Sequence, residues 1–207
     1  MIKAVIFDYD LTVARTLRMR LGLLRHYSKK YNISLPWLIW NMPKFYGMSL
    51  TDGKGILKKH LNINLDKTHF IEYRKEYKKR TKYISINSPE VYAQLQKQVK
   101  IGIITNELKD LVKLICDQHK LTFDFIEDTS KGDTKVGLLK KTAKKLKLKP
   151  AEILYVGDHP KDIIAGKKAG TKTAGFKTIL HTHWQLKKEH PDYILHTLSE
   201  LPDLIAN

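Results

Sequence analysis

A short apolar segment near the start of the chain ends abruptly in acidic residues. Ala4 to Phe7 contains β-branched residues, and Asp8, Asp10 and Thr12 follow it at alternate positions. An apolar run of this length predicts a β-strand that is buried on both faces, as in a parallel sheet. Such sheets bind ligands at the carboxyl ends of their strands. Two carboxylates there resist joint ionisation, so we expect a bound cation, although a solvated turn also fits.

Strand and helix patterns alternate from residue 88 to the end of the chain. Apolar runs at 100–106 and 153–158 resemble the opening segment, and shorter strands are predicted at 122–126, 172–175 and 192–194. Helical spacing follows residue 88, recurs at 107–119, 135–147 and 162–170, and begins again near residue 199. This alternation predicts an α/β fold: a Rossmann-like parallel sheet of about six strands with helices on both faces.

Residues 13–82 show helical spacing and no confident strand. A first helix follows Thr12, and further helices are predicted at 36–46, at 54–60 and at 66–80, where Asp66 fits the N-cap position. We therefore expect two parts. Residues 1–12 and 83–207 form the α/β core domain, and residues 13–82 form an inserted helical cap domain.

The chain is strongly basic, with 38 Lys and Arg against 21 Asp and Glu and a formal net charge of +17. Such a surface attracts anions, including nucleic acid, acidic lipids and phosphorylated metabolites. No nucleic-acid motif accompanies the charge, so solvated lysine faces are the favoured interpretation and nucleic acid is not the expected partner.

Cysteine content and hydropathy bear on location. The one cysteine, Cys116, lies in a segment with helical spacing, which predicts a packed thiol and a reducing, cytoplasmic location. The start of the chain does not resemble a signal peptide. The most apolar later stretch, 35–48, is too short and interrupted for a bilayer span, so we expect no membrane segment.

Parallel strands place their carboxyl ends along one edge of the sheet. This rule brings together Asp8, Asp10, Thr105 and Asp158, although they are far apart in the sequence. The carboxylates match Mg²⁺, a hard cation that takes few protein ligands and keeps room for substrate phosphate. A nearby lysine, a hydroxyl and helix-start amides suit phosphoryl oxygens. The sequence therefore predicts phosphoryl-transfer chemistry.

Four motifs in this order resemble those of the haloacid dehalogenase-like hydrolase superfamily. Asp8-Tyr-Asp10-Leu-Thr12 is similar to motif one, Ile104-Thr105-Asn106 to motif two, Lys135 to motif three, and Gly157-Asp158-His-Pro-Lys-Asp162 to motif four. The resemblance covers essentially the whole chain, including the helical insert where this family places its type one cap.

The resemblance implies catalytic and metal-binding roles. Asp8 is the expected nucleophile that forms an aspartyl-phosphate, and Asp10 is the expected general acid and then the base that activates water. Mg²⁺ is the expected cofactor. Its ligands would be a carboxylate oxygen of Asp8, the backbone carbonyl of Asp10, and Asp158.

The remaining motif residues receive phosphate-binding and supporting roles. Thr105, Asn106 and Lys135 would hold the oxygens of the transferred phosphoryl group. Asp162 and Thr12 would support the ligands without contacting the substrate. Helix capping is an equally good interpretation of Asp162.

The implied activity is a magnesium-dependent phosphatase that hydrolyses a phosphate monoester of a small metabolite. The dehalogenases of this superfamily lack an acid at the position of Asp10, which favours phosphate over carbon–halogen chemistry. A phosphomutase or phosphotransferase would use the same residues. A non-catalytic anion-binding or nucleic-acid-binding protein is a further alternative, which the intact set of motif residues disfavours.

Several residues allow competing interpretations. Lys131 competes with Lys135 as the phosphate-binding lysine, and the helix start at 135 favours the latter. We expect exposed histidines rather than a zinc site from three histidines, His159, His181 and His183.

The helical insert contains several aromatic residues that fit two different roles. Core packing of the insert is favoured over a substrate wall for Trp37, Trp40, Phe45 and Tyr46. The loop at 47–54, which contains glycine and hydroxyl residues, is the candidate element for substrate selection.

Overall fold

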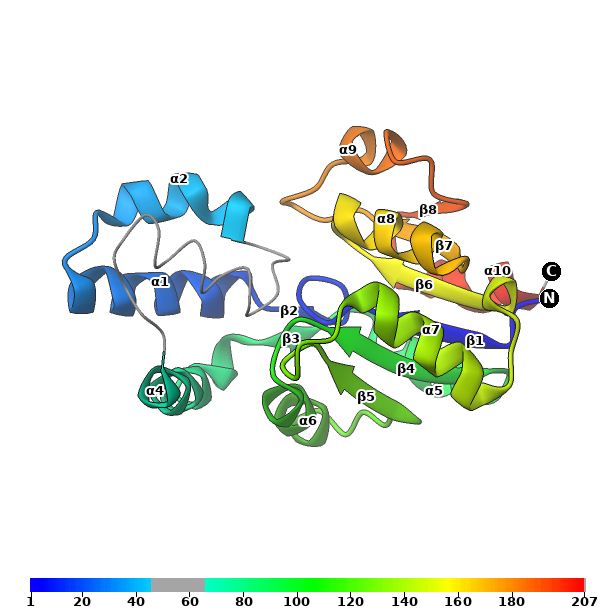
Figure 1. The fold of residues 1–207 in the computed structure, drawn as a ribbon, viewed down its shortest axis with the longest axis horizontal. Helices are drawn as coiled ribbons and strands as arrows, with labels where there is room; N and C mark the ends of the chain where they lie inside the picture. The colour runs from blue at the N-terminus through cyan, green and yellow to red at the C-terminus, as the bar shows by residue number, and fades with distance from the viewer. Residues whose placement is uncertain (46–65, 207) are drawn as a thin grey trace.

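The computed structural model describes residues 1–45 and 66–206, and a six-stranded parallel sheet lies at its centre (Figure 1). The order across the sheet is β5-β4-β1-β6-β7-β8, so β1 lies between β4 and β6. Every pair of neighbouring strands in this sheet is parallel, which confirms the predicted α/β fold class. The strands are β1 (Ala4–Phe7), β4 (Lys100–Thr105), β5 (Phe125–Asp128), β6 (Ile153–Gly157), β7 (Lys172–Phe176) and β8 (Tyr193–Leu195).

Helices cover both faces of the sheet, because side chains of a strand alternate between the two faces. Val5 and Phe7 pack in one hydrophobic cluster with α5 (Pro89–Gln96), α6 (Lys109–Gln118) and α10 (Leu201–Ala206). Ala4 and Ile6 pack in a second cluster with α7 (Lys135–Leu146) and α8 (Pro160–Ala169). Asp8 directly follows β1 and lies two positions after Ile6, so its side chain is on the same face as Ile6 and points toward α7 and α8.

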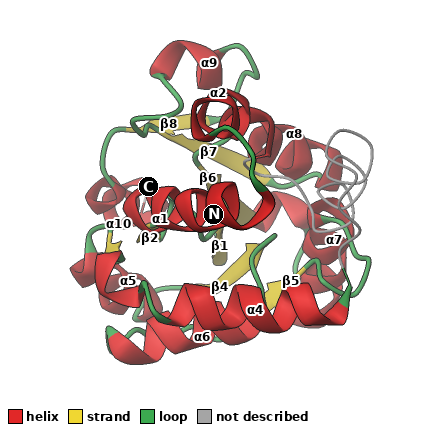
Figure 2. Cartoon of the chain, turned by 90° about the vertical axis from the view of Figure 1, so that its left-hand side faces the viewer, coloured by secondary structure: helices red, strands yellow, loops and turns green. Residues whose placement is uncertain are grey.

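Three helices of the predicted insert lie beyond the carboxyl ends of the strands (Figure 1). They are α1 (Leu17–Tyr31), α2 (Leu35–Phe45) and α4 (Lys67–Lys78), and in Figure 2 they lie in front of the sheet. Asp66 caps α4 as expected, because its carboxylate accepts hydrogen bonds from the backbone N–H groups of Thr68 (2.8 Å) and His69 (3.2 Å). The division into a cap at 13–82 and a core stays a prediction.

The two chain segments that join these helices to the sheet run side by side. Two-residue strands, β2 (Ala14–Arg15) and β3 (Ser85–Ile86), pair antiparallel, and the Asn87 amide donates to the carbonyls of Leu11 and Thr12, both at 2.8 Å. The sequence did not predict this pair, because two residues are too few to show a strand period.

Two further elements differ from the expectations. The predicted strand at 122–126 begins instead at Phe125, because the Asp124 carboxylate accepts a hydrogen bond from the N–H of Ile101 (2.9 Å) and so fixes 124 in the preceding turn. The short helix α9 (His183–Lys187) was not expected. The predicted helix at 54–60 and the loop at 47–54 lie outside the described residues.

Burial tests the expectations for single side chains. Cys116 is buried, as its spacing predicted. The expected core packing of the insert's tryptophans is wrong, since Trp40 is 83% exposed and Trp37 38%. Trp40 lies on the side of its helix opposite Leu38, which is buried. Within the described ranges, none of the helices combines the length and the apolar character that a bilayer crossing requires.

Candidate active site

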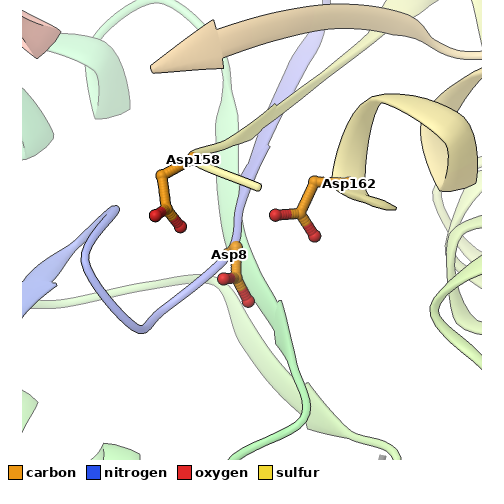
Figure 3. A group of neighbouring side chains, drawn as sticks. All are labelled: Asp8, Asp158 and Asp162. Atoms are coloured by element: carbon orange, nitrogen blue, oxygen red, sulfur yellow. The ribbon is translucent and has the colours of Figure 1, made fainter. Parts of the chain in front are cut away.

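Three buried carboxylates converge at the carboxyl edge of the sheet (Figure 3). Asp8 follows β1, Asp158 follows the neighbouring β6, and Asp162 lies in the first turn of α8. Each offers an oxygen that lies within 4.8 Å of the others. The hydrogen bond from the Asp8 N–H to the carbonyl of Val156 (2.8 Å) extends the ladder between β1 and β6 and sets this geometry.

Lys135 lies between two of these carboxylates. Its ammonium is 2.7 Å from Oδ1 of Asp8 and 2.7 Å from Oδ1 of Asp162. Lys135 is the first residue of α7, which packs on the sheet face toward which Asp8 points. The competing lysine at 131 is exposed. The structure therefore brings Lys135 to the cluster.

Burial controls the electrostatics of the cluster. Burial raises the pKa of Asp8 to about 8; Lys135 opposes the change, and Asp162 and Asp158 add to it. Burial likewise raises the pKa of Asp158. Although burial works in the other direction for an ammonium, Asp162 and Asp8 hold the pKa of Lys135 well above its usual range. The cluster thus contains more negative charge than one lysine compensates, and its hard oxygen donors fit Mg²⁺.

Asp158 faces two hydroxyl groups and an imidazole ring. One oxygen faces the hydroxyl of Thr12 (3.4 Å), and the other faces the hydroxyl of Thr178 (3.2 Å) and Nδ1 of His181 (3.3 Å). Thr12 therefore contacts a candidate metal ligand directly. The expectation of an exposed His181 is wrong, because its ring is buried against Asp158 and against His159, with ring centroids 4.4 Å apart.

Asp162 both caps a helix and contacts the cluster. Its Oδ2 accepts a hydrogen bond from the backbone N–H of His159 (3.1 Å), which closes the first turn of α8. Its Oδ1 accepts from Lys135 and, at 3.3 Å, from the hydroxyl of Tyr155. The close approach of Asp162 to the sheet requires glycine at 157, where a Cβ would lie 2.4 Å from the Cβ of Asp162.

The residues of the second motif lie at the end of β4, beside β1. Thr105 is buried, and its hydroxyl accepts a hydrogen bond from the N–H of Glu107 (3.0 Å). The side-chain carbonyl of Asn106 accepts from the hydroxyl of Thr129 (2.9 Å). The register between β1 and β4 pairs Phe7 with Ile103, so Asp8 lies beside Ile104, and Thr105, the last residue of β4, lies one residue further along.

The side chain of Asp10 lies outside the carboxylate group formed by the other three aspartates. Its Oδ2 accepts from Nη2 of Arg20 (2.6 Å), and its Oδ1 accepts from Nε of Arg20 (3.3 Å) and from the hydroxyl of Thr16 (2.7 Å). The backbone carbonyl, the expected metal ligand of Asp10, is independent of these contacts. Arg20 was not predicted from the sequence, because an arginine in an amphipathic helix matches an ordinary solvated face.

The fold and this site define a class of enzyme. A Rossmann-like core presents an acidic cluster and a lysine at the carboxyl edge of its central strands, where α/β enzymes carry out their chemistry. The family model for haloacid dehalogenase-like hydrolases matches residues 5–176. The chain therefore belongs to the haloacid dehalogenase-like hydrolase family, as its four motifs predicted, and is an enzyme of the phosphatase type found in that family.

Of two curated relatives, one matches over the full chain and the other over about half of it. The chain is 29% identical over 221 residues to a protein named pyrophosphatase PpaX from Bacillus cereus (strain G9842), with 100% of this chain and 97% of the relative covered. A second pyrophosphatase PpaX, from Anoxybacillus flavithermus, is 32% identical over 116 residues, with 54% of each chain covered.

Solved structures share the fold at lower identity. A predicted phosphatase from Clostridium acetobutylicum superposes with a TM-score of 0.77 at 20% identity, covering 100% of this chain and 99% of that one. A predicted phosphoglycolate phosphatase from Haemophilus somnus 129PT gives a TM-score of 0.75 at 18% identity, covering 99% and 98%. These similarities show that the chain shares its arrangement of helices and strands with those two proteins.

Proposed function

We propose that this protein is a magnesium-dependent phosphatase that hydrolyses a phosphate monoester of a small metabolite through an aspartyl-phosphate. The observation that carries the proposal is the contact between Lys135 and Asp8 inside the cluster completed by Asp158 and Asp162. A carboxylate, a lysine that matches phosphate charge and a site for a hard cation are the groups that phosphoryl transfer requires.

Asp8 is the proposed nucleophile: an oxygen of its carboxylate attacks phosphorus, and the bond to the leaving oxygen breaks. Lys135, the hydroxyl of Thr105 and the backbone N–H of Asn106 hold the phosphoryl oxygens. Asp8, Asp158 and the carbonyl of Asp10 would hold Mg²⁺, which supplies neutralisation of phosphoryl and carboxylate charge. Asp162 orients Lys135 and the first turn of α8, and Thr12 orients Asp158.

Asp10 is the proposed general acid and base. It gives a proton to the leaving oxygen in the first step, and in the second it removes a proton from the water that attacks the aspartyl-phosphate. The products are an alcohol and inorganic phosphate, and Asp8 is regenerated as a carboxylate. The proposed location is the cytoplasm, where the buried thiol of Cys116 stays reduced.

The names of the Bacillus relatives make pyrophosphate the first compound to test beside the monoesters. In pyrophosphate the leaving group is a second phosphate, and the same residues would transfer the first one. The basic surface, with its formal net charge of +17, is compatible with attraction of either kind of anion.

The test is release of inorganic phosphate by the purified protein from pyrophosphate and from a panel of sugar, glycolate, nucleotide and aryl phosphates. We expect turnover that requires Mg²⁺ and stops with a chelator. Transfer of phosphate within or between substrates without its release would instead support a phosphomutase or phosphotransferase. Salt-sensitive binding to arbitrary DNA or RNA without turnover would support the binding alternative.

A further inference from the structure

A hydrogen-bonded network joins Asp10 to a buried glutamate through one guanidinium group. Nη2 of Arg20 lies 2.6 Å from Oδ2 of Asp10 and 2.5 Å from Oε2 of Glu107. Nη1 of Arg20 donates to the hydroxyl of Tyr73 (2.6 Å), and that hydroxyl donates to the same oxygen of Glu107 (2.6 Å). Among the residues that the structure describes, Arg20 thus contacts two carboxylates and one phenol.

Apart from Asp10, the members of this network come from three separate parts of the fold. Arg20 belongs to α1, Tyr73 to α4, and Glu107 to the turn that follows Thr105 and Asn106 at the end of β4. A second contact also joins α4 to this loop. The hydroxyl of Tyr9, the residue between Asp8 and Asp10, lies 3.0 Å from the hydroxyl of Tyr77 on α4. The helices beyond the sheet are therefore connected to the loop that carries Asp10.

Glu107 is held firmly. It is 4% exposed, its Oε1 accepts the N–H of Leu108 (2.7 Å), and its Oε2 accepts from Arg20 and Tyr73. Burial raises the pKa of this carboxyl, and the charge of Arg20 opposes that change. Charge-assisted hydrogen bonds to several acceptors restrict a guanidinium to one orientation, and a buried charge that loses its partner is costly.

We propose that Glu107 and Arg20 are positioning residues for Asp10: the buried glutamate fixes the guanidinium, and the guanidinium fixes the carboxylate. The guanidinium group of Arg20 binds both oxygens of Asp10, and Thr16 binds one of them. These contacts fix both the position and the orientation of the Asp10 carboxylate. Arg20 itself does not contact the reacting atoms in this proposal. The inference rests on the proposed function, in which Asp10 protonates the leaving oxygen.

A role through Asp10 has a kinetic signature that a merely structural role lacks. Protonation of the leaving oxygen matters for alkyl phosphates, whose alcohols leave poorly, and matters little for p-nitrophenyl phosphate, whose phenolate leaves unaided. The ratio kcat/KM reports the steps up to the first irreversible transfer, whereas kcat also includes hydrolysis of the aspartyl-phosphate, in which Asp10 is the base.

The experiment compares kcat/KM of the parent and Arg20→Gln on p-nitrophenyl phosphate and on an alkyl phosphate from the metabolite panel. We expect a loss of about 10- to 100-fold on the alkyl ester, since general acids contribute about 100- to 10,000-fold. We expect less than about a threefold loss on the aryl ester, with kcat lowered for both. Glu107→Gln, which keeps the shape of the side chain, should give the same pattern if Arg20→Gln does not fold.

The matched control is Arg74→Gln. Arg74 also joins α4 to the core by two bonds to one carboxylate, with Nε 2.7 Å from Oδ2 and Nη2 3.2 Å from Oδ1 of Asp110, but does not touch Asp10. We expect this variant to keep the parent rates on both esters. In an Asp10→Asn background, Arg20→Gln should cause no further loss on the alkyl ester.

Two results would overturn the positioning role while leaving the phosphatase proposal intact. One is an equal loss, or no loss, on the two esters in Arg20→Gln. The other is a full additional loss in the Asp10→Asn background. Absence of Mg²⁺-dependent phosphate release by the parent would instead remove the proposed function, so the two failures are distinguishable.

Discussion

The ammonium of Lys135 lies 2.7 Å from the carboxylate of Asp8, the residue that immediately follows the central strand β1. Asp162 shares the same ammonium, and Asp158 completes the group. When all are ionised, three carboxylates and one lysine leave two negative charges, which one divalent cation neutralises. The charge of the site therefore matches Mg²⁺, in agreement with its oxygen donors.

Asp8→Asn should lower turnover by roughly a thousandfold or more, because an amide oxygen does not attack phosphorus as a carboxylate does. The fold should persist, since the side chain keeps its shape. Phosphate release and circular dichroism check both statements. Asp133→Asn, which breaks an exposed contact with Lys141 at 2.6 Å, is the control and should retain the parent rate. A parent-like rate in Asp8→Asn contradicts the nucleophile assignment.

Asp158→Ala should raise the Mg²⁺ concentration for half-maximal activity more than Asp162→Ala does. The charge of Asp162 is already compensated by Lys135 at 2.7 Å, whereas Asp158 faces two hydroxyls and a histidine. Mg²⁺ titrations of phosphate release for the two variants provide the comparison. The reverse order would exchange the metal-binding and supporting roles of these aspartates.

Gly157→Ala should disturb the site through α8. The new Cβ would lie 2.4 Å from the Cβ of Asp162, so the start of α8 must shift, which we expect to cost about 1–3 kcal/mol of unfolding free energy and to weaken Mg²⁺ activation. Gly137→Ala is the matched control: its nearest contact is 3.4 Å, and alanine inside α7 should be neutral or stabilising by up to about 1 kcal/mol. Equal stability and equal Mg²⁺ response of the two variants would contradict this account.

His159 should make stability depend on pH between about 6.5 and 4. Burial and the neighbouring His181 lower the pKa of His159 to about 4, and its Nδ1 accepts the N–H of Lys161 (3.0 Å) at the start of α8. The unfolded chain therefore binds more protons in this window, and the unfolding free energy falls as the pH falls. Because the ring is partly exposed, we expect a loss on the order of 1 kcal/mol.

The control for this prediction is His159→Asn, which keeps an N-cap acceptor and removes the titrating ring. Denaturant unfolding at several pH values measures the unfolding free energy of both proteins. The variant should lose less stability than the parent between pH 6.5 and 4. An identical slope in the two proteins would show that other groups cause the pH dependence.

Much of the core could be predicted because its signals are local. Buried parallel strands must be apolar throughout, so the segments that contain Ile6, Ile103 and Val156 stand out in the sequence. Because parallel strands place their carboxyl ends along one edge of the sheet, Asp8 and Asp158 could be expected to lie together without any knowledge of their contacts. The same rule placed Asp10 at this edge but gave no orientation for its side chain.

The contacts that escaped prediction join residues distant in sequence. Arg20 and Glu107 are 87 positions apart, and each has a local pattern that fits an ordinary helix or helix start. His181 follows a turn, and nothing near it in the sequence signals burial against Asp158. Phe123 and Phe125 alternate as a strand would, yet the hydrogen bonds of Asp124 decide where β5 begins.

The pairing of β1 with β4 and β6 has a consequence for how this enzyme could be studied during folding. Thr12 and Asp158 meet across 146 positions of sequence, and a slip of one residue in any of the three strands would turn a site residue to the opposite face. Such non-local pairings form late, because closing long loops is costly in entropy. After dilution from denaturant, enzymatic activity should therefore return more slowly than the circular dichroism signal of the helices. The rate at which activity recovers would then measure how fast the sheet is completed.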